Sequence, residues 1–67
     1  MSRLIHAIRV VTDGVFELDI EVEPGRREAF RFEVVGDVIR APSAFLLGYG
    51  ELVRPVLEAF SKWLEET

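Results

Sequence analysis

The sequence contains no cysteine, asparagine or glutamine, and it has only one histidine and one lysine. Without cysteine, neither a disulfide framework nor a metal site with thiolate ligands can form. A zinc site draws three or four ligands from cysteine, histidine and carboxylates. With no cysteine and one histidine, the chain offers few of the ligands that zinc prefers. No nucleophile motif surrounds any of the serines. We therefore expect a protein that is not an enzyme and that holds neither a metal nor a cofactor.

The sequence also lacks a long apolar run and an excess of positive charge. Its longest apolar run, residues 44–47, is far too short to cross a bilayer, and the first residues lack the apolar core of a secretory signal. We therefore expect a cytoplasmic protein with no membrane partner. The net charge of −4 and the isoelectric point of about 4.8 disfavour nucleic acid as a partner, because phosphate binding needs clustered cations.

Apolar residues are abundant enough to form a folded core. They make up 49% of the 67 residues, well above the range of disordered chains, so residues 1–67 are predicted to form a single α+β domain. At this size, and without disulfides or metals, oligomerisation is the remaining way to add stability. The preference for arginine over lysine and the absence of asparagine and glutamine give a thermophile-like composition, although a high genomic GC content would also favour arginine.

Four strands are predicted from alternation and turn signals. The clearest is residues 15–23, where apolar and acidic residues alternate strictly. The other three are residues 3–11, 28–35 and 38–41, and a glycine-containing turn separates each strand from the next. This series predicts a four-stranded antiparallel β-meander.

A C-terminal helix is predicted over residues 51–66, because apolar side chains recur there every three or four residues. Pro55 is tolerated only in the first turn, so the helix should begin just before it. Ser43 is expected to cap a short turn over residues 44–47, and glycines on both sides of Tyr49 interrupt the chain before the main helix. The predicted fold is a two-layer ββββα arrangement with the helix packed on one face of the sheet.

The strand register is predicted from the requirement that one face of the sheet stays apolar. Three-residue loops at the first two turns and a two-residue loop at the third give three buried rows, which are Val10–Phe16–Val34–Ile39, Ile8–Leu18–Phe32–Ala41 and His6–Ile20–Phe30. The opposite face then carries charge pairs across the strands, which are Arg9–Glu17–Glu33–Arg40, Asp19–Arg31 and Glu23 between Arg3 and Arg27. We interpret these acids as a solvated ladder rather than as a metal or catalytic cluster.

Two other features receive a structural interpretation. His6, the sole imidazole, falls on the buried face with no partner that would orient it as a general base, so we predict a structural role. The segment around Tyr49 precedes a helix, where anions can bind, but it lacks the spacing of a phosphate loop and Glu51 would repel an anion. We expect Tyr49 to pack over the edge of the core.

A row of four valines is the one signal for a partner. In the predicted register these valines lie side by side across all four strands on the charged face, and two apolar residues of the first strand extend this area. One helix cannot cover both faces of the sheet, and contiguous exposed apolar area marks an interaction site. The predicted partner interface consists of Ile5, Ala7, Val11, Val15, Val35 and Val38.

These observations favour a small non-enzymatic protein–protein interaction or regulatory module, a homodimer or a small subunit of a complex. One alternative is a sheet that binds single-stranded nucleic acid, although the predicted exposed face has acids and no aromatic residue for base stacking. Another is a ligand-binding protein or small enzyme whose site is completed between subunits.

Overall fold

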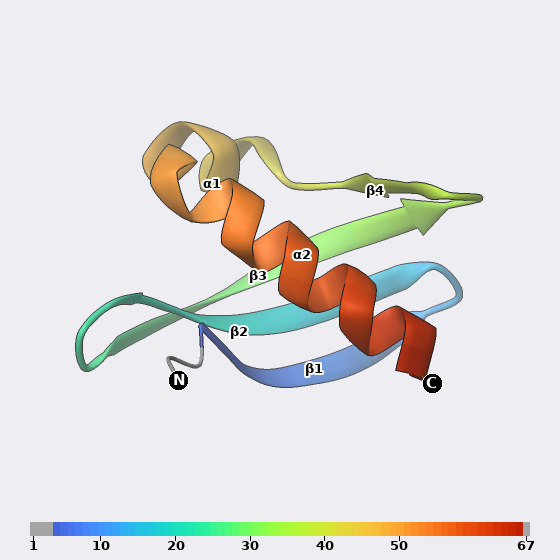
Figure 1. Ribbon diagram of the computed structural model, residues 1–67, viewed down its shortest axis with the longest axis horizontal. Helices are drawn as coiled ribbons and strands as arrows, with labels where there is room; N and C mark the ends of the chain where they lie inside the picture. Colours follow the sequence, from blue (N-terminus) through green and yellow to red (C-terminus); the bar gives the residue numbers. More distant parts are fainter. Residues whose placement is uncertain (1–3, 67) are drawn as a thin grey trace.

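The computed structural model describes residues 4–66 and shows the expected two-layer α+β fold (Figure 1). Four antiparallel strands form one sheet in the order β1-β2-β3-β4, and two helices follow. The bounds are β1 Ile5–Thr12, β2 Val15–Glu23, β3 Arg26–Val35, β4 Val38–Arg40, α1 Ser43–Gly48 and α2 Gly50–Glu66. Arg3, which the predicted charge ladder used, lies outside the described residues.

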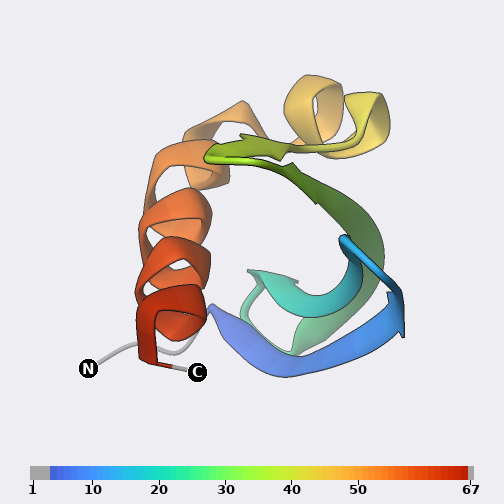
Figure 2. The same ribbon diagram turned by 90° about the vertical axis from the view of Figure 1, so that its right-hand side faces the viewer.

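The sheet is strongly curled, and α2 lies along its concave side (Figure 2). The core cluster consists of Leu18, Ile20, Val22, Phe32, Phe45, Val56 and Phe60. Phe32 is at its centre, with its ring centroid 5.5 Å from that of Phe45 and 5.9 Å from that of Phe60. The core is therefore an aromatic cluster, with tilted and edge-to-face ring contacts, between the middle strands and both helices. No helix within residues 4–66 has the length and apolar character needed to cross a membrane.

The predicted register is correct between β3 and β4 and for residues 7–10 of β1, and it is wrong between β2 and β3 and at both ends of β1, where Ile5 pairs with Ile20 and Thr12 pairs with Val15. Val10 pairs with Phe16, and Val34 pairs with Ile39, as expected. Between β2 and β3, however, Phe16 pairs with Phe32 rather than with Val34, which is a shift of two residues. A shift of two leaves every side chain on its predicted face, because successive side chains alternate between faces. The apolar face is therefore conserved, and only the neighbours within it change.

The turn between β2 and β3 causes this shift. Glu23 pairs with Arg26, so the turn has two residues rather than three, and Gly25 in it adopts a φ of +81°. A β-bulge precedes this turn in the chain, because Glu21 pairs with Arg27 and Val22 is left as the extra residue of β2. The first turn is built in the same way, but there the bulge in β1 restores the predicted pairing.

A second bulge in β1 overturns the placement of His6. Ile5 pairs with Ile20, Ala7 pairs with Asp19, and His6 is the extra residue between them. Ile5, rather than His6, therefore packs against the core, and the His6 ring lies beside Glu21 of the charged face. A bulge shifts the chain by one residue and so exchanges the faces of the residues beyond it.

The helical segment also departs from two expectations. Pro42, not Ser43, is the N-cap of α1, and its carbonyl oxygen accepts hydrogen bonds from the N–H groups of Phe45 and Leu46 at 3.0 and 3.1 Å. α2 begins at Gly50, which places Pro55 inside the helix rather than in its first turn.

Candidate functional site

The predicted valine row is not continuous in the structure. Val15 lies opposite Glu33 instead of Val35, as a direct consequence of the shift between β2 and β3. Val35 keeps only Val38 as its apolar cross-strand neighbour. Of the two β1 residues in the predicted interface, Ile5 packs against the core and Ala7 lies opposite Asp19. The six predicted residues therefore do not form one patch.

Exposed valines instead flank the β1–β2 and β3–β4 turns, which lie at the same end of the sheet (Figure 1). They do not share one face, because Val10 pairs with Phe16 on the apolar face whereas Val35 and Val38 pair on the charged face. We call them the hairpin-end valines: Val10, Val11, Val35 and Val38. Val10 is 66% exposed, and the paired Val35 and Val38 are 60% and 59% exposed. The Val34 N–H donates to the Gly14 carbonyl oxygen at 2.8 Å, so the first turn is tied directly to β3 beside these residues. Leu46 and Leu47 of α1 are also exposed.

A groove of about 740 Å³ runs between β1 and α2. Residues 4–8 line one wall, and the other wall is formed by Ala59, Lys62, Trp63 and Glu66. β1 is an outer strand, so within the described chain its far side has no strand neighbour. We call this feature the edge groove. Sequence reasoning missed it, although the helical spacing of the four α2 residues and the terminal position of the first strand were available as signals.

The charged face carries a partly confirmed ladder. Arg9 lies opposite Glu17, and its Nη2 donates to Glu17 Oε1 at 2.6 Å, while Glu33 lies opposite Arg40. The rest of the predicted ladder is wrong because of the shift between β2 and β3: Asp19 lies opposite Ala29 instead of Arg31, Glu17 opposite Arg31 instead of Glu33, and Glu23 opposite Arg26 instead of Arg27. These contacts are solvent-exposed, so each contributes only a few tenths of a kcal/mol up to about 1 kcal/mol.

His6 has a specific partner on this face. Its Nε2 lies 2.6 Å from Glu21 Oε1, and Glu21 Oε2 accepts a hydrogen bond from the Gly25 N–H at 3.4 Å. These two hydrogen bonds, the one with His6 first, lower the pKa of the Glu21 carboxyl below 4.5. The pair joins the bulge of β1 to the turn after β2.

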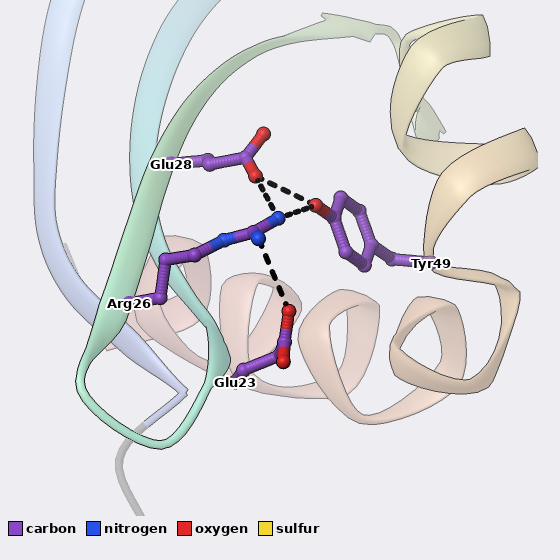
Figure 3. Close-up of polar contacts among 4 residues, drawn as sticks. All are labelled: Glu23, Arg26, Glu28 and Tyr49. Atoms are coloured by element: carbon purple, nitrogen blue, oxygen red, sulfur yellow. Dashed lines mark hydrogen bonds and ion pairs between the residues drawn. The ribbon is translucent and has the colours of Figure 1, made fainter.

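A second polar network lies beside the same β2–β3 turn, where it joins β3 to the helical segment (Figure 3). The Tyr49 hydroxyl donates to Glu28 Oε2 at 2.6 Å and accepts from Arg26 Nη2 at 2.6 Å, and Arg26 Nη2 also donates to Glu28 Oε2 at 2.7 Å. Arg26 further contacts Glu23 at 3.2 Å. The Tyr49 ring packs against Phe30. We call these four polar residues the Tyr49 cluster; they attach the joint between α1 and α2 to the start of β3.

The contribution of the Tyr49 cluster to the stability of the fold depends on pH. The hydrogen bond to Glu28 raises the Tyr49 pKa above 10, and the same bond, together with Arg26, lowers the Glu28 pKa below 4.5. A lowered carboxyl pKa stabilises the fold above the unfolded value and loses this effect as the pH falls through the folded pKa. A raised tyrosine pKa stabilises the fold until the pH exceeds 10, and the effect is lost as the pH rises toward the folded pKa. The cluster should thus stabilise the fold fully between about pH 5 and pH 9.

Tyrosinate absorbance tests this directly, since the chain has a single tyrosine. We expect the Tyr49 pKa in the folded protein to lie above 10, and the pKa in urea to return to the ordinary value. Glu28→Gln should lower the folded pKa, because it removes the carboxylate that holds the proton. Glu58→Gln on the far surface is the matched control and should leave it unchanged. Identical titrations in folded and unfolded protein would show that the hydroxyl is not bonded as described.

Residues 4–66 contain no group of three histidine, cysteine or acidic side chains that could hold a metal ion. Both polar networks are internally satisfied, and no buried side-chain nitrogen or oxygen of the described residues lacks a hydrogen-bond partner. Comparisons with protein-family models, with curated proteins and with solved structures find no match to this chain.

Proposed function

We propose that this chain is a non-enzymatic protein–protein interaction or regulatory module, which acts as a homodimer or as a small subunit of a complex. The observation that carries this proposal is the exposure of the hairpin-end valines, above all of Val35 and Val38, which pair with each other. Exposed apolar side chains of this kind cost solubility unless a partner covers them, and Val35 and Val38 offer a partner one adjoining apolar pair.

The exposed valines suit recognition because their backbone is held in place. Val35 and Val38 face each other across a two-residue turn, and the adjoining Val34 N–H is fixed by the Gly14 carbonyl. β-branched side chains in a sheet have few rotamers, so little side-chain entropy is lost when a partner covers them.

A sheet that binds single-stranded nucleic acid receives no support from the structure. Every aromatic side chain belongs to the core cluster or packs against it. The outward positions of β2 are acidic, with Glu17, Asp19 and Glu21 facing β3 or β1. Base stacking would lack its aromatic residues there, and the arginines of this face, such as Arg9, Arg27 and Arg31, lie opposite acids rather than forming a basic groove.

The double variant Val35→Lys, Val38→Glu tests the valines as a contact surface. These two side chains face each other, so the introduced charges attract, and the free energy of unfolding should change by less than about 1 kcal/mol. We expect the wild type to retain a specific protein partner from cells of the source organism, and the variant to lose it. Affinity capture followed by cross-linking mass spectrometry measures both.

The matched control is Val35→Ile, Val38→Ile, which keeps the surface apolar and should keep the partner. Circular dichroism must show that all three proteins are folded. If the Lys–Glu variant is folded and binds the same partner equally well, the hairpin-end valines are only solvated sheet.

A further inference from the structure

The edge groove has the shape of a site for one more β-strand. Its first wall is formed by residues 4–8, and it includes Ile5 and Ile8, which pack against the core, together with His6 and Ala7, which lie beside acids of the charged face. The groove therefore follows the edge of β1 rather than one of its faces. Its second wall, Ala59, Lys62, Trp63 and Glu66, is a single stripe of α2 at spacings of three and four residues. A strand added at this edge would pair with β1 and lie beneath α2.

We propose that this strand is β1 of a second copy of the chain, paired antiparallel with β1 across a twofold axis. The proposal rests on the interaction function proposed above, but it uses the edge of β1, and it leaves the paired Val35 and Val38 of both copies exposed for another partner. An edge strand is a template for such pairing because its outward N–H and C=O groups lack partners.

The charges of β1 permit two copies to approach. The strand has only two titratable side chains, and both are already bonded within their own chain: Arg9 to Glu17 at 2.6 Å and His6 to Glu21 at 2.6 Å. β1 contains no proline. Uncompensated charge, proline and β-bulges are the usual protections of an edge strand. β1 lacks the first two, and its two bulges leave residues 7–10 between them regularly paired.

The bulges of β1 set the length of the new ladder. Between them, Ala7, Ile8, Arg9 and Val10 pair regularly with β2, so this segment keeps the regular geometry that a new neighbour needs. The other edge of the sheet, β4, has only three residues. Pairing through β1 around a twofold axis therefore gives a closed dimer rather than an open fibre.

The helices supply complementary charges that identify the occupant as a second copy. Lys62 and Glu66 stand one turn apart on the groove side of α2, and within residues 4–66 neither has an ion-pair partner. A twofold axis near Trp63 makes the two α2 helices antiparallel and brings Lys62 of each copy next to Glu66 of the other. Ala59 is small, so it allows the helices to approach. The same surface is thus complementary to itself, as an isologous interface requires.

Charge reversal with the full chain tests this arrangement by sedimentation and light scattering. The wild type should be a dimer, and Lys62→Glu should weaken it by roughly tenfold, because two attractive contacts become repulsive. Glu66→Lys should do the same. An equimolar mixture of the two variants should recover the dimer as a heterodimer, as should the double variant Lys62→Glu, Glu66→Lys. Emission of the only tryptophan, Trp63, should shift to the red on dilution as the groove opens.

Each result of this experiment is decisive. Recovery in the mixture supports contact between the two helices, because a simple loss of folding in either variant would not be rescued by the other. A wild type that stays monomeric up to about 1 mM overturns the proposal, and so does a dimer that both reversals leave unchanged. A monomer that still captures a partner through the hairpin-end valines, or one whose groove takes a foreign strand, would overturn the second-copy assignment and leave the proposed function standing.

Discussion

Phe32→Ala is expected to reduce the free energy of unfolding by about 3–5 kcal/mol and to leave the protein largely unfolded near room temperature. The Phe32 side chain is fully buried, and its ring contacts those of Phe45 in α1 and Phe60 in α2. Its removal leaves a cavity at the one place where both helices meet the sheet. A chain of 67 residues has only a few kcal/mol of stability to lose.

The denaturation midpoint in urea measures this loss. Val38→Ala is the control on the adjacent strand, since this side chain is 59% exposed and its truncation should cost less than about 1 kcal/mol. Equal midpoints for Phe32→Ala and the wild type would contradict the claim that the aromatic cluster around Phe32 stabilises the fold. A variant of Phe32 that unfolds with the midpoint of Val38→Ala would do the same.

The buried face of the sheet was predictable because a period of two is insensitive to the errors that turn prediction makes. Phe16 and Phe32 were assigned to the apolar face, and both point there although they pair with each other rather than with Val34 and Leu18. An error of two residues at a turn preserves faces, whereas a bulge, which shifts the chain by one, exchanges them. His6 was misplaced for the second reason alone.

The candidate surfaces could not be predicted in the same way, because they depend on the exact strand register, which the alternation of apolar and polar residues does not determine. The continuous valine row required Val15 to lie beside Val35. The bulge at Val22 and the two-residue turn that follows it shift the pairing of β2 with β3, so that Val15 lies beside Glu33. The Tyr49 cluster required Glu28 to lie at the edge of the buried face, opposite Ile20, where the hydroxyl can reach it. Such a placement follows from the exact register and from the path of the chain after β4, and neither has a local signal.

Two matched glycine substitutions test the turns that set this register. Gly14 and Gly25 are each the second residue of a two-residue turn, and their φ angles are +76° and +81°. Alanine in this left-handed region costs about 1–2 kcal/mol relative to glycine. A Cβ on Gly25 would have no atom within 4 Å, whereas one on Gly14 would lie 3.0 Å from the Val34 carbonyl oxygen.

Gly14→Ala should therefore destabilise the protein by about 2–4 kcal/mol, and Gly25→Ala by only about 1–2 kcal/mol. The added cost arises because the backbone of the first turn must move away from β3, which also strains the hydrogen bond from the Val34 N–H to the Gly14 carbonyl. Amide hydrogen exchange of Val34 should rise in Gly14→Ala and stay unchanged in Gly25→Ala. Equal losses of stability in the two variants would show that the first turn does not approach β3 closely, and the support for the hairpin-end valines as a rigid surface would fall with it.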